Sequence, residues 1–221
     1  MSVLAAVECA AWCAFWFLPA LLASPSGLKH AFTYHSGRGV QIESVWGNGV
    51  MFAERLVGLE VVTANAWGAF ETVSAWTDPL RSISTLTQLL LLAAGCLLLW
   101  RGRWQIAPHD AHGRAVWLLG GATLAHLLFI VSGKVLSPQY LIWIIPMIVV
   151  LPGTHTTSTR MLAAFAATLL ATQLLFPYAY HHLLERDALG LAVLTTRNLL
   201  LLLLTVLVAR MCWLEPGPHR R

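Results

Sequence analysis

The chain has 221 residues, of which 57% are apolar and only 11% carry a charge. Soluble domains contain about 25% Asp, Glu, Lys and Arg, so a chain this poor in charge cannot cover a surface that faces water. The formal net charge is +4, but the arginines flank apolar runs instead of gathering on one face, which is typical of membrane orientation and not of nucleic-acid binding. These values exclude a soluble globular domain and predict a membrane protein that contacts lipid and binds no nucleic acid.

Apolar runs predict an all-α fold, a polytopic transmembrane helical bundle with about six spans, which we treat as a single transmembrane domain over residues 1–221. The expected spans are residues 3–23, 83–100, 115–131, 135–151, 161–178 and 189–211. Crossing the hydrocarbon takes about 20 residues. Several of these runs are shorter, so we expect them to use loop residues or tilt.

The distribution of arginines predicts the orientation. One set of short connecting segments, together with the C-terminal segment, contains Arg101, Arg103, Arg114, Arg160, Arg210, Arg220 and Arg221. The other side holds the long segment 24–80, the break at 132–139 and the loop 179–188. Short loops decide orientation and long loops count for little. Both termini are therefore expected on the cytoplasmic side of the cell membrane.

Residues 24–80 are expected to form a long extracytoplasmic loop with an amphipathic segment. From residue 40 to 56, the apolar residues Ile42, Trp46 and Val50 fall on one stripe at helical spacing, and a second stripe carries Gln41, Ser44, Asn48 and Arg55. This pattern predicts an interfacial helix that lies in the membrane surface. Gly47 and Gly49 oppose it, since each costs about 1 kcal/mol in a helix.

The first polar segment that composition does not explain is residues 34–44, in which Arg38 stands between two glycines. An arginine there, just before an expected helix, can direct its donor fork and free backbone N–H groups at an anion. Near a membrane the obvious anion is a phosphate. The alternative, which spacing alone favours, is that Arg38 and Lys29 simply anchor the loop to lipid headgroups.

The second polar segment is residues 132–140, between two apolar runs. Gly133 and Pro138 both oppose a continuous helix, and Lys134 places a charge close to the hydrocarbon. Non-helical backbone at that depth persists only when it is buried in protein or lines a wet cavity. An ordinary tight turn between two helices is the equally simple alternative.

Two further groups of polar residues have structural explanations. Arg197 lies inside the last apolar run, where it either snorkels outward, the interpretation we favour, or faces a polar cavity. His181 and His182 stand near Glu185 and Asp187, but adjacent histidines point to different faces of a helix. We therefore expect no metal site and no cofactor.

The two polar segments, with the sequences RGVQIES (38–44) and KVLSPQYLIWIIP (134–146), together resemble the C-terminal half of polyprenyl-phosphate-dependent membrane glycosyltransferases. The closest likeness is to glycosyltransferase family 87 and related bacterial mannosyltransferase-like proteins, and the second segment is also similar to the mannosyltransferase of GPI-anchor assembly. The likeness covers most of the chain in order and spacing.

This resemblance implies a C-type glycosyltransferase fold with its site on the extracytoplasmic side, where a sugar such as mannose leaves a polyprenyl phosphate carrier. It makes Arg38 and Lys134 candidates to bind the carrier phosphate. It makes Gln41, Glu43, Gln139 and Tyr140 candidates to line the sugar pocket.

The chain departs from the family in length and in its catalytic acid. Enzymes of this type are roughly twice as long, and their acidic residue lies in an N-terminal half that has no match here, so the catalytic residue is unknown. The chain is a fragment, one part of a split enzyme whose second subunit carries that half, or an inactive relative, and we expect an enzyme only if the N-terminal half completes it. The alternatives are a membrane transport component, because broken helices with charges at depth also mark substrate paths, and a non-catalytic membrane scaffold subunit.

Overall fold

The computed structural model describes residues 3–102, 111–151 and 155–214. Arg103, Arg220 and Arg221, which contribute to the predicted orientation, lie outside the described residues. The chain divides into two compact units, Met1–Arg38 and Gly39–Arg221, and each is described by itself. The boundary falls within the segment 24–80 that the sequence predicts to be one loop.

The first unit consists of two helices that meet at a sharp bend. α1 (Val3–Ala23) ends where the sequence predicts, and α2 (Pro25–Gly37) begins immediately after it. Pro25 cannot continue α1 because it has no N–H to donate. Ser24 caps α2 instead, and its hydroxyl accepts the N–H of Gly27 at 3.1 Å. The apolar parts of the two helices are bent by 112°.

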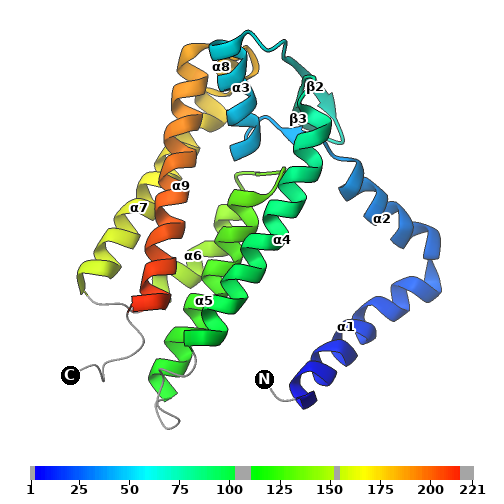
Figure 1. Ribbon diagram of the computed structural model, residues 1–221, viewed down its shortest axis with the longest axis vertical. Helices are drawn as coiled ribbons and strands as arrows, with labels where there is room; N and C mark the ends of the chain where they lie inside the picture. The colour runs from blue at the N-terminus through cyan, green and yellow to red at the C-terminus, as the bar shows by residue number, and fades with distance from the viewer. Residues whose placement is uncertain (1–2, 103–110, 152–154, 215–221) are drawn as a thin grey trace. The chain divides into compact units, whose positions relative to one another are not determined.

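Four long apolar helices form the second unit's candidate membrane spans (Figure 1). They are α4 (Thr77–Gly102), α5 (Ala111–Ser132), α7 (His155–Gln173) continued by the π-helix η2 (Leu174–Tyr178), and α9 (Ala188–Leu214). Counting the bent pair of the first unit as one span gives up to five. The predicted number of about six is not confirmed.

The difference arises at α6 (Tyr140–Val150), which packs between α5 and α7. The sequence predicts a span over 135–151, but the backbone is not helical before Tyr140. α6 has 11 residues and is about 16 Å long, whereas the hydrocarbon core is about 30 Å thick. Pro138 explains the late start, because the residue before a proline is disfavoured in the helical conformation.

A small antiparallel sheet and two helices lie at one end of this bundle (Figure 1). The strands are β1 (Val40–Gln41), β2 (Val62–Ala66) and β3 (Ala69–Val73), in the order β1-β3-β2. Trp67 and Gly68, both with positive φ, make the two-residue turn between β2 and β3. The fold is therefore helical with a minor sheet that the all-α prediction did not include.

The predicted helix of the 40–56 segment exists as α3 (Val45–Val57), capped by Ser44 and ended by Gly58 at φ +68°. Of the predicted polar stripe, Arg55 is exposed, but Gln41, Ser44 and Asn48 are buried together with Ile42 and Val50, because α3 packs on β1 and α9. Its position in a membrane interface stays a prediction.

Two apolar cores hold the second unit together. The larger core joins α5, α6, α7 and α9, and its fully buried side chains include Leu127, Leu141, Ile144, Leu201 and Leu204. The smaller core connects β1 and α3 to η2, the short helix α8 (Tyr180–Leu184) and the start of α9. It is formed by Ile42, Met51, Leu175, Leu183, Leu191 and Leu194. Because Ile42 packs against Leu191 and Leu194 in this smaller core, the polar residues that follow β1 lie against the first turns of α9.

Candidate functional site

The two polar segments that the sequence singles out contact each other, although nearly a hundred residues separate them. Gln41 makes the contact twice: its backbone N–H donates to the carbonyl of Lys134 at 2.9 Å, and its side-chain Oε1 accepts the N–H of Leu136 at 3.0 Å. The indole of Trp46 adds a bond to the carbonyl of Ser132 at 2.8 Å. Residues 132–136 are thus held by groups on and after β1.

These bonds explain how a non-helical backbone persists between α5 and α6. Gly133 and Leu136 are buried, and a buried N–H without a partner costs about 1–3 kcal/mol. A simple turn does occur, but only at the end of the segment, where the N–H of Tyr140 donates to the carbonyl of Ser137 at 3.0 Å. The segment is therefore an extended stretch enclosed by protein and followed by a turn.

The two candidate cations belong to different units. Arg38 is the last residue of the first unit, and its guanidinium carbon lies 5.9 Å from the centre of the Tyr34 ring. Lys134 belongs to the second unit, where it is partly buried. Binding of one phosphate by both residues stays a prediction.

The remaining candidates in the second segment lie on the N-terminal turn of α6. Gln139 is exposed, and Tyr140 is partly buried. The ring of Tyr140 stacks on that of Trp143, with centroids 4.9 Å apart. An exposed amide beside a fixed aromatic ring is suited to contact a sugar, since the ring offers an apolar face and the amide offers both donors and an acceptor.

Glu43 faces a charge that comes from a membrane-type helix. Arg197 of α9 is fully buried, and its Nη2 donates to the main-chain carbonyl of Glu43 at 2.6 Å. The carboxyl group of Glu43 is itself buried and bonds to the hydroxyl of Tyr180. The snorkelling interpretation of Arg197 is therefore wrong, because the side chain points to protein and not to the membrane surface.

The electrostatics of this buried group favour a proton on Glu43. Burial raises the pKa of Glu43, while the charge of Arg197 and the hydrogen bond from Tyr180 lower it by less. Burial and the neighbouring Glu43 also raise the pKa of Tyr180. Both groups consequently hold their protons more tightly than in water.

Amides and hydroxyls extend the polar group along α9. Asn48 donates to the hydroxyl of Thr195 at 3.0 Å, and Asn198 donates to Asn48 at 3.4 Å. We call Glu43, Asn48, Tyr180, Arg197 and Asn198 the buried polar centre. Because it joins residues 43–48 to α9, it positions Gln41, two residues before Glu43, against the segment 132–136.

Sequence analysis identifies Gln41 and Glu43 but not the role that their burial gives them. Neither lines the open pocket described below, which also contains no part of residues 132–140. Their assignment to a sugar pocket stays a prediction. The sequence gives no role to Tyr180, which lies in the predicted loop 179–188, or to Asn198, because nothing in the last apolar run tells which polar side chain faces the protein.

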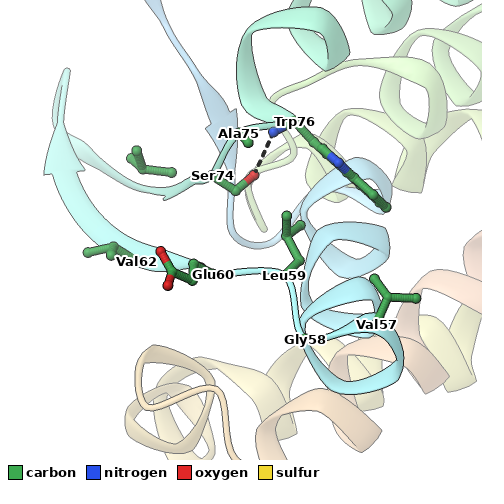
Figure 2. A pocket seen from close by; sticks show the side chains of 9 residues that line it. Val57, Gly58, Leu59, Glu60, Val62, Ser74, Ala75 and Trp76 are labelled. Carbon is green, nitrogen blue, oxygen red and sulfur yellow. Dashed lines mark hydrogen bonds between the residues drawn. The ribbon is translucent and has the colours of Figure 1, made fainter.

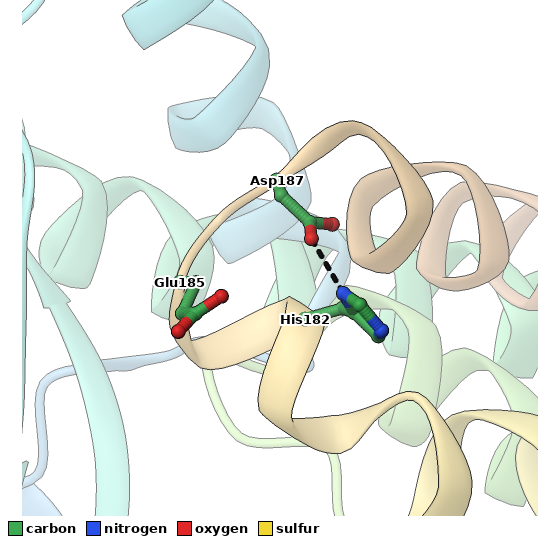
Figure 3. Close-up of side chains that lie close together, drawn as sticks. All are labelled: His182, Glu185 and Asp187. Carbon is green, nitrogen blue, oxygen red and sulfur yellow. Dashed lines mark hydrogen bonds and ion pairs between the residues drawn. The ribbon is translucent and has the colours of Figure 1, made fainter.

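Three titratable side chains gather at the turn between α8 and α9 (Figure 3). The ligand atoms of His182, Glu185 and Asp187 lie within 4.8 Å of one another. Asp187 caps α9 by accepting the N–H of Gly190 at 2.9 Å and bonds to Nδ1 of His182 at 2.5 Å. These bonds lower the pKa of Asp187. The cap of α9 therefore explains why Asp187 and His182 lie together. Glu185 pairs with Nε2 of His181.

No protein-family model, no curated protein and no solved structure matches this chain. The class of protein therefore follows from the chain itself. Its described residues form a mainly helical protein with four to five apolar helices long enough to cross a membrane. That count is compatible with a multi-pass membrane protein, and the polar groups above lie at one end of its bundle.

Proposed function

We propose that this protein is a membrane glycosyltransferase-like protein that binds the phosphate of a polyprenyl-phosphate sugar at residues 132–140, on the extracytoplasmic side. The observation that carries the proposal is a pair of hydrogen bonds: the N–H of Gln41 donates to the carbonyl of Lys134, and the N–H of Leu136 donates to Oε1 of Gln41. They join the two segments that resemble such enzymes and keep residues 133–139 out of a helix. Side chains at a helix break next to the hydrocarbon can reach a lipid-linked headgroup without unfolding a span.

The chemistry requires a cation beside the carrier phosphate. In the transfer, an acceptor hydroxyl attacks the anomeric carbon, and the bond from that carbon to the phosphate oxygen breaks. The phosphate leaves with the electron pair, so negative charge develops on it. Lys134, held by its main chain at the helix break, is the candidate that stabilises this charge. The base that takes the hydroxyl proton is not assigned.

Photolabelling tests the proposal directly. The full chain is reconstituted in liposomes with a photoreactive polyprenyl phosphate, and labelling is measured over a range of carrier concentrations. Lys134→Ala removes the charge and Lys134→Arg retains it. Arg38→Ala tests the other cation separately, and its matched control is Lys29→Ala, an exposed lysine of α2, the helix that ends just before Arg38.

We expect saturable labelling of the wild type that polyprenyl phosphate competes away and polyprenol does not. Labelling should be lost in Lys134→Ala, retained in Lys134→Arg and Lys29→Ala, and weakened in Arg38→Ala. Equal labelling of the wild type and Lys134→Ala would show that the phosphate does not bind at residues 132–140 and would contradict the proposed function.

A further inference from the structure

An open pocket of about 600 Å³ lies between the end of α3 and the end of β3 (Figure 2). Figure 2 shows the side chain of Leu59 between those of Val57 and Trp76, with Glu60 and Val62 further along the chain toward β2. The lining is mainly apolar and consists of Val57, Gly58, Leu59, Glu60, Val62, Val73, Ser74, Ala75 and Trp76. We call it the α3–β3 groove.

The groove leaves large apolar side chains uncovered. Val57 exposes 67% of its surface, Val62 62%, and Val73 and Trp76 46% each. Leu56, next to the groove on α3, is exposed as well. A contiguous apolar surface of this kind on a protein requires an apolar partner, because its contact with water is unfavourable by about 25 cal/mol per Å².

The helix that follows the groove identifies that partner. α4 begins at Thr77, directly after Trp76, and only 6% of its most apolar stretch is buried inside the protein. Leu86, Leu89 and Leu90 are among its exposed side chains. α4 packs against α5, but a candidate span with so few buried residues faces hydrocarbon over much of its surface.

Tryptophans place the groove at the edge of this hydrocarbon. Trp76 precedes α4 and Trp100 lies near its end, and both are exposed. They are about 36 Å apart along the helix axis at 1.5 Å per residue. That separation is larger than the thickness of the hydrocarbon core, about 30 Å, and smaller than that of the whole bilayer, about 40–45 Å. It therefore places both tryptophans in the two interfaces between hydrocarbon and water, which tryptophan side chains prefer.

We infer that the α3–β3 groove is a lipid-binding surface that inserts into the membrane interface and is occupied by bilayer phospholipid. The valines and Trp76 lie at the level of the headgroups and the first carbons of the acyl chains. Asp78 and Arg81, which pair at 3.3 Å on the first turns of α4, lie at the polar boundary. The sheet and α3 are thereby anchored to the bilayer beside the first span of the second unit.

Nitroxide scanning of the full chain tests this inference. Cys9, Cys13 and Cys96 are replaced by alanine, and the buried Cys212 is retained. Single cysteines then replace Val57, Val62 or Val73, and each labelled protein is reconstituted in phospholipid liposomes. Collision rates with oxygen, which concentrates in hydrocarbon, and with a water-soluble nickel chelate are compared at each position.

Two exposed positions calibrate the scale: Leu89→Cys on α4 for hydrocarbon and Glu185→Cys at the α8–α9 turn for water. We expect the ratio of oxygen to nickel collisions at the three valine positions to be several-fold higher than at Glu185 and below that at Leu89. The ratio should not change when polyprenyl phosphate is added.

Ratios equal to that of the Glu185 position would show a groove open to water and would overturn the inference. Labels shielded from both reagents would overturn it too, because protein and not lipid would then cover the groove. A ratio that changes only with polyprenyl phosphate would assign the groove to the carrier and likewise contradict occupation by bilayer phospholipid.

Discussion

Removal of the Arg197 charge should strongly destabilise the second unit. Arg197 is fully buried and is the positive charge that acts on the buried carboxyl group of Glu43. Replacing Arg197 removes the positive charge that opposes the effect of burial on Glu43, and this costs up to about 3–5 kcal/mol at a pH where the carboxyl group of Glu43 is ionised. Arg197→Met keeps most of the side-chain volume and removes the charge, so we expect the largest loss once the pH exceeds the raised pKa of Glu43.

The double variant separates the charge pair from simple packing. When Glu43→Gln accompanies Arg197→Met, no buried charge is left without a partner, and much of the lost stability should return. The coupling energy between the two substitutions should be at least about 2 kcal/mol, within the range for residues in contact. The free energy of unfolding is measured by titrating the detergent-solubilised protein with SDS and following the helical circular dichroism signal.

The pH dependence provides a second test of the same pair. Because the pKa of Glu43 is raised in the folded protein, the folded state binds this proton more tightly, and stability falls as the pH rises through the folded pKa. Arg197→Met removes an interaction that lowers the pKa of Glu43, so it widens the pH range over which the free energy of unfolding falls. The deficit of the variant should grow by up to about 1.4 kcal/mol per pH unit and be smaller at pH 5 than at pH 8.

Additive effects of the two substitutions would refute this reasoning. So would a loss below about 1 kcal/mol in Arg197→Met, since that is the size of an ordinary hydrogen bond. In either case the guanidinium would not be balancing the carboxyl group of Glu43.

Three further predictions concern single positions. Gly47→Ala should destabilise α3 in the same titration, because a Cβ there would collide with the backbone carbonyl of residue 41, whereas Gly49→Ala, with open space around it, should stabilise by about 0.5–1 kcal/mol. Gln41→Ala leaves the buried main-chain N–H of Leu136 unpaired and should cost about 1–3 kcal/mol. Gln139→Ala, at an exposed position, should change stability little. Equal losses in the two variants would contradict a stabilising role for the hydrogen bond between Gln41 and Leu136. Asp187→Ala removes the cap of α9 and should destabilise the protein; because the pKa of Asp187 is lowered, the charge-dependent part of this loss should shrink as the pH falls through the lowered pKa, and a loss unchanged at low pH would count against it.

Most candidate spans follow from the sequence, because a run of apolar residues long enough to cross lipid has few other stable structures. α4, α5 and α9 each contain the run predicted for them. The span predicted over residues 135–151 does not form as a full-length helix, and the reason is local. Their apolar content fits a span, but Pro138 and the bonds to Gln41 keep the first residues extended.

The sheet illustrates a signal that was present but weak. β2 and β3 are short and contain Val62, Thr63, Thr72 and Val73, and the two-residue turn between them ends in Gly68. Branched residues on both sides of such a turn are a hairpin pattern. The aromatic content of the same segment favours a membrane interface instead.

The burial of α3 depends on contacts with residues far away in the sequence, which the periodicity of its own residues does not predict. Its polar residues suggested a face toward water, but α9 supplies partners for Asn48 and for the segment before it. Gly47 argues against a helix by propensity alone. In the fold, it allows α3 to approach the carbonyls of residues 41 and 42, so the unfavourable residue is required by packing.

The proposed function requires that the carrier phosphate binds at the helix break between α5 and α6. The most direct test is to photolabel the reconstituted wild-type chain with a polyprenyl phosphate that carries its photoreactive group next to the phosphate, and to identify the modified residue by peptide mass spectrometry. The account predicts a label within residues 132–140 that unlabelled polyprenyl phosphate competes away. A saturable label confined to other segments, or none at all, would contradict it.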